Sequence, residues 1–368
     1  MEYLNKLLNL NPFSYNYKQR NNIFFKAVIE NFDHQLKNSY EYKKWSYFNG
    51  FKKNTDVKSL QDLPFFPNSI FKYHNLTSVK KINKIINSSG TTSQAKSKIN
   101  LDNQNSKRQT LILSKILSEL LGKKRRPFII VDKDPHIVKN SYELSARYAG
   151  LSGYFLAAST KNYVLKDNNK GSFFEINEII KMINFYKSRN EKIVIIGYTY
   201  LIYEKLLSVL RNNSDTLEFP SNTILIHFGG WKKLKEKKIS KNMLNSLIKK
   251  HLKIKDKNII DIYGFSEQLG TVYPSRGSRG CRVPAYSELI VRSTENLKPI
   301  EDGRIGFLQF ISPVPTSYPG LSILNDDLGK IILRKKNCIE FEIMGRPENS
   351  LPRGCGDTLP ENFLFRKN

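Results

Sequence analysis

The sequence predicts an α/β protein in which a mainly parallel sheet is flanked by helices and joined to a small antiparallel β part. Two observations carry this prediction. Between residues 127 and 263, short apolar strands alternate with amphipathic helices, which is typical of parallel sheets covered on both faces. From residue 282 to residue 344, short alternating runs are separated by Pro, Gly and Asp, which is typical of antiparallel β structure.

The N-terminal part is predicted to be helical over residues 18–46. One face of this segment is apolar and contains Ile23, Phe24, Ala27, Val28 and Phe32. The segment from Pro64 to Pro67 ends the helical pattern, because proline cannot donate a backbone hydrogen bond inside a helix. Another amphipathic helix is predicted at Gln109–Leu121.

The middle of the chain supplies the elements of the parallel sheet. Strands are predicted at Pro127–Asp132, Lys192–Gly197, Thr223–His227 and Ile259–Tyr263. Helices are predicted at Glu175–Tyr186, Tyr198–Arg211 and Lys241–Leu252.

The character of the sequence changes near residue 279. Antiparallel strands are predicted at Glu288–Val291, Gly306–Phe310 and Lys330–Leu333. We therefore expect an α/β core over residues 1–278, a small β-rich subdomain over residues 279–345, and an exposed C-terminal arm over residues 346–368.

One segment with the chemistry of a phosphate site runs from Asn87 to Lys98, with the sequence NSSGTTSQAKSK. Glycine permits a tight backbone path, and hydroxyls, free amides and ammonium groups together suit a polyphosphate. The spacing is not that of a Walker A loop.

A second segment delivers a carboxylate beyond a strand. The apolar strand Ile259–Tyr263 stops at Gly264, and Glu267 follows shortly after it. A carboxylate at a strand end is where an α/β protein would hold a magnesium ion that bridges phosphates. The two segments together indicate an enzyme that uses ATP.

Both segments resemble signatures of the adenylate-forming superfamily. The first is similar to its Ser/Thr-Ser/Gly-Gly-Thr-Thr-Gly loop, and Tyr263 to Glu267 match its aromatic-Gly-x-Ser/Thr-Glu motif. Asn325 to Gly329 and the pair Gly345-Arg346 follow in the order of the Thr-Gly-Asp-Leu element and the Gly-Arg pair of that superfamily. The resemblance implies the fold of the large domain of these enzymes.

Further segments resemble those of the acyl-protein synthetases, the fatty-acid-activating ligases of the bacterial luminescence fatty-acid reductase. These segments are Asp62 to Lys72, Gly229 to Lys232, Thr316 to Pro319, and the pair Gly354-Cys355. The resemblance covers roughly residues 20 to 360.

The resemblance implies how ATP is bound. The β- and γ-phosphates would be gripped by Ser89, Gly90, Thr91, Thr92, Ser93 and Lys98. Two positions depart from the pattern, because Ser93 stands where the family usually has glycine and Lys96 where it often has proline.

The second motif would hold Mg²⁺ and the nucleoside. Resemblance implies that Glu267 coordinates Mg²⁺ and that Tyr263 stacks on adenine, although a Tyr at a strand end can also be a core aromatic. Gly264 and Ser266 belong to the same motif, and Gly229 and Gly230 would let the backbone approach the other face of the base.

The ribose is assigned by resemblance to Asp327. Asp326 is the rival, since a shift of one residue in a strand reverses the face. Arg346 would contact the phosphate region or form a salt bridge at a hinge.

Cys355 is the expected acyl carrier. It lies between glycines in a polar tail close to Arg353, and a thiol near a cation ionises more readily. Resemblance implies that the acyl group rests on such a cysteine before it passes to a partner. Cys281, beside Arg282, is a weaker rival, and Cys338 is predicted to be a buried apolar residue.

Full-length adenylate-forming enzymes continue past the Gly-Arg pair as a lid that carries a catalytic lysine. The sequence ends at Asn368, soon after Arg346, so we expect this lid to be absent. Either Lys232 replaces the lid lysine, or the first half-reaction runs without one.

The predicted function is the ATP- and Mg²⁺-dependent activation of a fatty or related carboxylic acid as an acyl-adenylate. The acyl group would then pass to a cysteine thiol and on to a protein partner, either a reductase or an acyl carrier protein. One alternative is an acid–CoA ligase of the phenylacetate–CoA ligase type, which would not need Cys355.

Composition leaves an alternative of another class. The formal net charge of +27 would suit a nucleic-acid-binding protein. The lysines are spread along the chain and not gathered in one arm, however, which favours a solvated surface over nucleic-acid binding. Attraction of an acidic partner such as an acyl carrier protein is a third possibility. The sequence shows neither a signal peptide nor an apolar run of membrane-spanning length, and a cytoplasmic protein is expected.

Overall fold

The computed structural model describes residues 1–87, 96–136, 142–168, 171–231 and 238–346. The chain divides into two compact units. Unit 1 comprises Met1–Ile116, Gly264–Val272 and Arg282–Asn368, and unit 2 comprises Leu117–Tyr263 and Tyr273–Cys281. The three-part division expected from the sequence stays a prediction.

Unit 2 contains a seven-stranded sheet with the order β10-β9-β8-β7-β4-β5-β6. Its strands are β4 (Arg126–Lys133), β5 (Ala158–Asn168), β6 (Gly171–Phe173), β7 (Val194–Tyr198), β8 (Ile224–Phe228), β9 (Ile259–Tyr263) and β10 (Tyr273–Arg276). The five strands from β9 to β5 are parallel, and the edge strands β10 and β6 are antiparallel to their neighbours. The central strands are apolar runs that are buried along nearly their whole length, as expected for a sheet covered on both faces.

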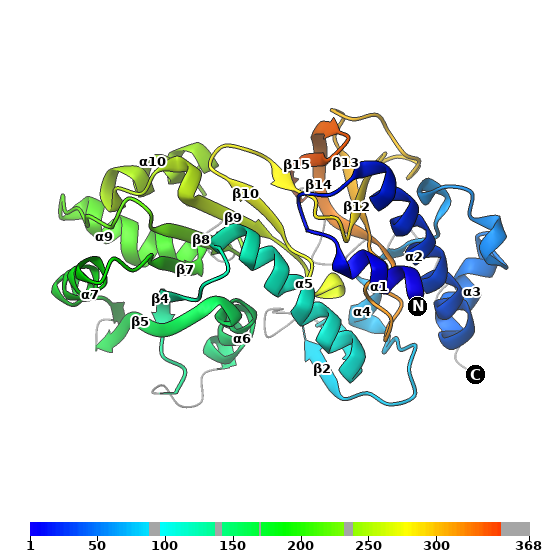
Figure 1. Ribbon diagram of the computed structural model, residues 1–368, viewed down its shortest axis with the longest axis horizontal. Helices are drawn as coiled ribbons and strands as arrows, with labels where there is room; N and C mark the ends of the chain where they lie inside the picture. Colours follow the sequence, from blue (N-terminus) through cyan, green and yellow to red (C-terminus); the bar gives the residue numbers. More distant parts are fainter. Residues whose placement is uncertain (88–95, 137–141, 169–170, 232–237, 347–368) are drawn as a thin grey trace. The chain divides into compact units, whose positions relative to one another are not determined.

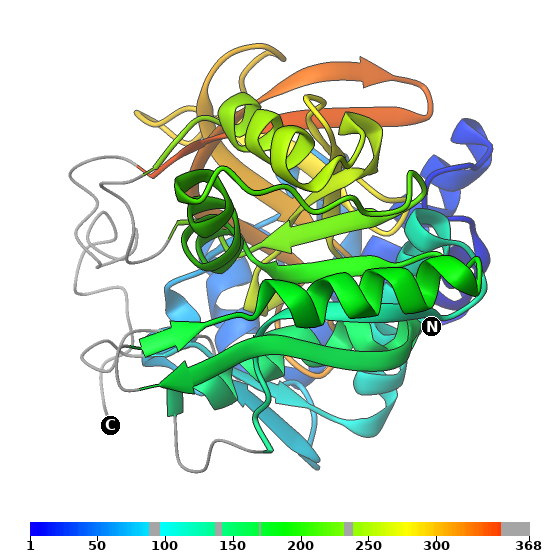
Figure 2. The same ribbon diagram turned by 90° about the vertical axis from the view of Figure 1, so that its left-hand side faces the viewer.

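Helices cover both faces of this sheet. They are α6 (Tyr142–Ser152), η3 (Gly153–Ala157), α7 (Ile176–Ser188), α8 (Thr199–Leu201), η4 (Ile202–Leu207), α9 (Ser208–Asn212), α10 (Lys241–Leu252) and η6 (Asp256–Asn258). Figure 1 shows α7, α9 and α10 on one side of the sheet and α6 on the other. Figure 2 shows α7, in green, running in front of the strands. The expected alternation of strands and helices is confirmed here.

Unit 1 contains an antiparallel sheet with the order β11-β15-β14-β13-β12. Its strands are β11 (Cys281–Arg282), β12 (Glu288–Arg292), β13 (Gly306–Ile311), β14 (Ser322–Lys335) and β15 (Cys338–Gly345). The short strand β1 (Phe66–Pro67) joins it by pairing in parallel with β14. A separate hairpin is formed by β2 (Lys84–Asn87) and β3 (Lys98–Leu101).

The helices of unit 1 begin at the N-terminus. They are α1 (Glu2–Asn9), α2 (Tyr17–Asn38), α3 (Tyr40–Phe48), η1 (Asn54–Asp56), η2 (Leu60–Asp62), α4 (Ile70–Tyr73) and η7 (Ser266–Gln268). Helix α5 (Asn103–Leu121) belongs to unit 1 as far as Ile116. Within the described part of the chain, no helix is long and apolar enough to cross a membrane.

The helical segment predicted over residues 18–46 is confirmed, and the chain divides it into two helices, α2 and α3, that meet at Ser39. The Ser39 side chain accepts a hydrogen bond from the backbone N–H of Tyr42 and so caps the start of α3. Serine favours this role because its oxygen satisfies a backbone donor that has no partner within the helix. The apolar face of α2 is buried as predicted at Phe24, Ala27, Val28 and Phe32.

Candidate active site

Glu267 lies in the turn η7, shortly after strand β9 ends at Tyr263. Its side chain is buried, with 5% of the residue exposed, and its Oε1 accepts a hydrogen bond of 2.6 Å from the Ser97 hydroxyl. The neighbouring Gln268 is also buried, and its Nε2 donates to the carbonyls of Phe310 and Gly320, each at 3.1 Å. Gln268 therefore anchors the turn, and Glu267 contacts Ser97 near the end of the segment Asn87 to Lys98.

The environment of Glu267 disfavours its charge. Burial raises the pKa of Glu267, and the hydrogen bond from Ser97 and the charge of Lys72 act in the opposite direction. The nearby charge of Asp326 raises the pKa further. A buried carboxylate of this kind gains most from a cation that would bind to it, because the cation offsets the loss of hydration.

A buried loop fixes the backbone of η7. Tyr318 is fully buried, and its hydroxyl donates to the carbonyl of Glu267 at 3.0 Å. The loop that carries Tyr318, residues 313–318, is itself anchored by side chains of α2 and α5. The anchoring hydrogen bonds run from Asn31 to the carbonyls of Pro313 and Pro315, from Gln35 to the carbonyls of Pro315 and Tyr318, and from Arg108 to the Thr316 hydroxyl. The carboxylate thus rests on a preorganised support.

Asp327 and Arg346 lie together in unit 1. Asp327 is in β14, Arg346 directly follows β15, and Arg346 Nε donates to Asp327 Oδ1 at 2.9 Å. The side chain of Asp327 is 16% exposed and that of Arg346 is 60% exposed. Asp326 is more deeply buried than Asp327. The two residues assigned by resemblance to ribose and phosphate therefore already form an ion pair that a ligand could share.

Gly229, Gly230 and Tyr263, which resemblance assigns to the adenine base, lie in unit 2. Gly229 and Gly230 follow β8 with φ of 77° and 59°, a backbone region that side chains other than glycine rarely adopt. A Cβ on Gly230 would meet no atom within 4 Å, so its backbone is openly accessible. Tyr263 ends the adjacent strand β9, and its ring is partly buried against Tyr273 at a centroid distance of 6.1 Å.

A buried polar network, which the sequence analysis did not predict, ties the ends of β7, β8 and β9 together. The Thr199 hydroxyl donates to the carbonyl of Phe228 at 3.2 Å, and His227 Nδ1 lies 3.0 Å from the same hydroxyl and 3.5 Å from Asp261 Oδ1. Burial lowers the pKa of His227, which favours the neutral ring, and the charge of Asp261 acts in the opposite direction. This network fixes the strand end from which Gly229 departs.

Several predicted residues lie outside the described part of the chain. These are Ser89, Gly90, Thr91, Thr92, Ser93, Lys232 and Cys355. Their roles stay predictions. Lys98 is described, and it is exposed at the start of β3, where it pairs with Asn87 in the β2–β3 hairpin. Gly264 and Ser266 lie between β9 and Glu267 in the chain.

Among the described cysteines, neither has the surroundings of a reactive thiol. Cys281 is 7% exposed. Cys338 is partly buried in β15, where burial raises the pKa of its thiol and Glu340 adds to the rise. A raised pKa lowers the fraction of thiolate, which is the attacking form. The weaker rival Cys281 is thus poorly placed to accept an acyl group in this conformation.

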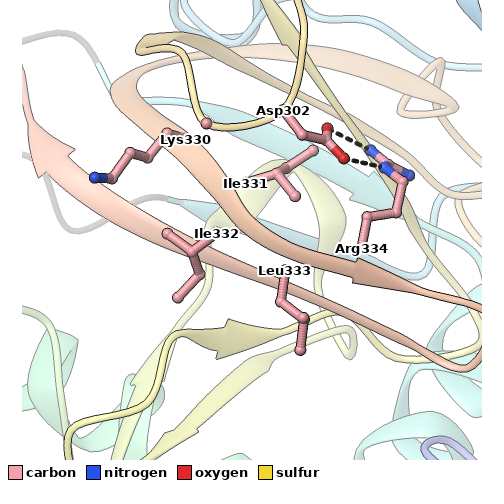
Figure 3. Close-up of a pocket in the computed structure, with 7 residues that line it drawn as sticks. Asp302, Lys330, Ile331, Ile332, Leu333 and Arg334 are labelled. Carbon is pink, nitrogen blue, oxygen red and sulfur yellow. Dashed lines mark hydrogen bonds and ion pairs between the residues drawn. The ribbon is translucent and has the colours of Figure 1, made fainter.

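The β-rich part of unit 1 contains a cavity of about 370 Å³ beside β14. Figure 3 shows Asp302 paired with Arg334 at one end and Lys330 at the other, with aliphatic side chains between them. None of the predicted site residues lines this cavity. Across the described ranges, no cluster of three or more His, Cys, Asp or Glu side chains forms a ready-made metal cage.

Three contributors to the Glu267 environment have no predicted role. Ser97 lies near the end of the phosphate segment, and Tyr318 lies in the Thr-Ser-Tyr-Pro element, so both belong to motifs that resemble the family. Lys72 closes the segment Asp62 to Lys72. Membership in these motifs was the signal in the sequence that could have pointed to the three residues. Their proximity to Glu267 could not be predicted from sequence spacing, because it arises only in the folded chain.

The chain matches known proteins over most of its length. A family model described as "Acyl-protein synthetase, LuxE" matches residues 2–364. A long-chain-fatty-acid–luciferin-component ligase of Aliivibrio fischeri is 24% identical over 357 residues, covering 94% of this chain and 89% of the relative. The protein of the same description from Vibrio harveyi is 23% identical over 322 residues, covering 84% and 80%.

Solved structures of an adenylate-forming ligase share the fold. A 2-hydroxyisobutyryl-CoA ligase in complex with 2-HIB-AMP, in the postadenylation state, superimposes with a TM-score of 0.59 at 14% identity, covering 89% of this chain and 68% of that chain. An open conformation of that ligase with 2-HIB-AMP and CoA gives a TM-score of 0.58 at 12% identity, covering 88% and 74%. The predicted fold class is confirmed by this likeness.

Proposed function

Because the chain belongs to the LuxE family of acyl-protein synthetases and is therefore an acyl-activating ligase, we propose that it joins a long-chain fatty acid to AMP and then to a thiol. The fatty acid is inferred from the relatives, which are long-chain-fatty-acid ligases. The observation that carries the proposal is the buried Glu267 in its preorganised turn, in contact with Ser97 near the end of the phosphate segment.

In the first half-reaction, a carboxylate oxygen of the fatty acid attacks the α-phosphorus of ATP. The new bond joins that oxygen to phosphorus, the bond from the α-phosphorus to the bridging oxygen breaks, and pyrophosphate leaves with the electron pair. The hydroxyls and amides of residues 89–93 and the ammonium group of Lys98 are proposed to hold the departing phosphates.

The residues around Glu267 fit a magnesium ion. Mg²⁺ prefers one or two carboxylates together with substrate phosphates and water, so a three-residue cage is not required. The buried and partly compensated carboxylate of Glu267 is the donor, and the Ser97 hydroxyl orients it. When bound, the ion would neutralise charge on the triphosphate.

The remaining roles concern the nucleoside. Asp327 is proposed to accept hydrogen bonds from the ribose hydroxyls, and Arg346, its ion-pair partner, to reach the phosphate region. Tyr263 is proposed to stack on adenine, and the backbone at Gly229 and Gly230, which is open at Gly230, to admit the base closely. Lys232 is proposed as a catalytic lysine of the adenylation step.

In the second half-reaction, a thiolate attacks the acyl carbon of the mixed anhydride. A carbon–sulfur bond forms, the bond between carbon and the AMP oxygen breaks, and AMP leaves with the electron pair. We assign the thiol to Cys355, and the buried state of Cys281 and the raised pKa of Cys338 support this choice. The acyl group would then move to a protein partner.

Exchange of label between pyrophosphate and ATP tests the proposal. The purified protein is incubated with ATP, Mg²⁺, labelled pyrophosphate and saturated fatty acids of increasing length. Label should enter ATP only when a fatty acid is present, because only the reversible formation of the acyl-adenylate returns pyrophosphate to ATP. Exchange that does not depend on any fatty acid, or release of ADP in its place, would contradict the proposal.

Tyr318→Phe is expected to weaken the response to Mg²⁺. The change removes the hydrogen bond to the Glu267 carbonyl and should cost about 1–3 kcal/mol in the free energy of unfolding, measured in urea. Residues that orient a metal ligand typically contribute about tenfold or more to metal affinity. The Mg²⁺ concentration for half-maximal exchange should rise accordingly.

Tyr286→Phe is the matched control. Tyr286 is also fully buried, and its hydroxyl donates to the carbonyl of Leu10. Its replacement should lower stability to a similar extent and leave the Mg²⁺ response unchanged. An equal change in both variants would mean that Tyr318 has a structural role only.

A further inference from the structure

Helix α3 presents an unusual outer face. Tyr40, Tyr47 and Phe48 are 65%, 42% and 61% exposed, and their spacing places them along one side of the helix together with Lys44. The opposite side is buried through Tyr42 and Ser46. Aromatic rings are costly to leave in water, and a row of them on a soluble surface marks a contact site.

Two lysines of α3 lie over rings of this aromatic row. The ammonium group of Lys44 lies 4.9 Å from the ring centroid of Tyr40, and that of Lys43 lies 5.5 Å from the centroid of Tyr47. Both ammonium groups are therefore within the range of a cation–π interaction. We call the surface formed by Tyr40, Lys43, Lys44, Tyr47 and Phe48 the α3 face.

The charge around the α3 face is strongly positive. Residues 37–58 contain six lysines but only two acids, Glu41 and Asp56. The carboxylate of Asp56 accepts hydrogen bonds from the backbone N–H groups of Lys52 and Lys53. A partner for this segment must therefore be acidic.

The segment from Phe66 to Tyr73, which ends in α4, connects α3 to the environment of Glu267 within unit 1. Phe66 packs against Tyr42 and Trp45 of α3, with ring centroids 5.6 Å and 5.8 Å apart. Phe71 of α4 packs edge-on against Tyr318 at 5.9 Å, and the Tyr318 hydroxyl donates to the carbonyl of Glu267.

We infer that the α3 face docks an acidic protein whose own thiol receives the acyl group after Cys355. This inference rests on the proposed function, because it names the partner to which the activated acyl group passes. An acidic rim on the partner would meet Lys43 and Lys44, and apolar side chains of the partner would cover the exposed rings. Docking beside α4 would bring the thiol toward the part of unit 1 that contains Glu267.

The test uses purified holo-acyl carrier protein, a small acidic protein with a thiol on a flexible arm, and the full-length chain. Transfer of a labelled fatty acid to the carrier is followed over a range of carrier concentrations and salt concentrations. Two double variants probe the face, Lys43→Glu with Lys44→Glu, and Tyr40→Ser with Phe48→Ser. Lys123→Glu with Lys124→Glu is the control, because these adjacent lysines are exposed in unit 2 and the change in charge is the same.

Each α3 variant should raise the KM for the carrier by about tenfold or more and leave fatty-acid-dependent pyrophosphate exchange unchanged. The wild-type KM should rise with salt, and the charge-reversed α3 variant should lose most of this salt dependence. The control should behave as wild type.

Three results would overturn the inference. They are an absence of transfer from wild type to the carrier, equal effects in the α3 and control variants, and an oligonucleotide that binds wild type but not the α3 variants while transfer is unaffected. The last result would assign the face to a nucleic acid. Pyrophosphate exchange in wild type distinguishes these failures from a failure of the proposed function, in which exchange itself is absent.

Discussion

Glu267→Gln should reduce fatty-acid-dependent pyrophosphate exchange by at least about a hundredfold, because the amide is almost the same size as the carboxylate but lacks the charge that a hard divalent cation requires. The Ser97 hydroxyl can still donate to the amide oxygen, so the local geometry is retained. Exchange is measured over a wide range of Mg²⁺ concentrations, since a weakened site requires more metal for the same rate.

The fold of the Glu267→Gln variant should be intact. Burial raises the pKa of Glu267, which means that keeping it ionised costs stability in the folded state. The neutral amide removes that cost, so the free energy of unfolding at neutral pH should not fall. Glu342→Gln is the control, because Glu342 is exposed on β15 of unit 1, where it forms an ion pair with Lys330. Unchanged exchange in Glu267→Gln at limiting Mg²⁺ would show that Glu267 is a structural carboxylate.

Cys355→Ser should separate the two half-reactions. Pyrophosphate exchange should survive because it needs no thiol, but stable acylation of the protein should be lost. A serine hydroxyl at neutral pH is far less ionised than a thiol and is a poorer nucleophile. Wild type incubated with ATP and a labelled fatty acid should acquire label that neutral hydroxylamine removes, as expected for a thioester, and the variant should stay unlabelled.

Cys338→Ser and Cys281→Ser are the matched controls for this experiment. Because Cys281 is buried and the pKa of Cys338 is raised, neither change should affect labelling. If Cys355→Ser became labelled as well as wild type, Cys355 would not be the acyl carrier. If acyl-adenylate instead passed directly to coenzyme A in that variant, the alternative of an acid–CoA ligase would hold.

Elements with strong local patterns could be predicted from the sequence. Strand β9 and helix α10 have the bounds that were predicted, Ile259–Tyr263 and Lys241–Leu252. The strand is apolar apart from Asp261. The helix begins after Ser240, whose side chain accepts from the Met243 N–H, and ends at Lys253 in a left-handed conformation.

Elements that depend on pairing were missed or shortened. Strand β5 (Ala158–Asn168) has no clear apolar pattern, because its residues 159–161 and 166–167 are polar and exposed. We attribute its conformation to parallel pairing with β4. Strand β14 was predicted only at Lys330–Leu333, whereas it begins at Ser322. The Asn and Asp residues at 325–327 disfavour strands locally, and they lie at a register shift of the β13–β14 pairing, between the pairs Gln309–Leu324 and Phe307–Leu328. The pairing on either side of the shift continues the strand across them.

In the candidate site, too, local motifs could be predicted from the sequence and long-range contacts could not. Glu267 could be predicted as a site residue because its motif is contiguous, and Asp327 and Arg346 because their order along the chain resembles a known pattern; their roles stay predictions. Ser97 is 170 residues from Glu267 and Tyr318 is 51 residues from it, and only the fold brings them together. A single sequence contains no signal for such contacts, so the contacts had to come from the structure.

The fate of oxygen from the fatty acid tests the central claim most directly. The protein is given ATP and a fatty acid whose carboxylate carries two ¹⁸O atoms, together with holo-acyl carrier protein or another thiol acceptor, and the nucleotides are analysed by mass spectrometry. If the carboxylate attacks the α-phosphorus and a thiol then displaces AMP, the AMP must contain one ¹⁸O and the pyrophosphate none. Label in inorganic phosphate together with ADP, or AMP without label, would contradict the formation of an acyl-adenylate by this chain.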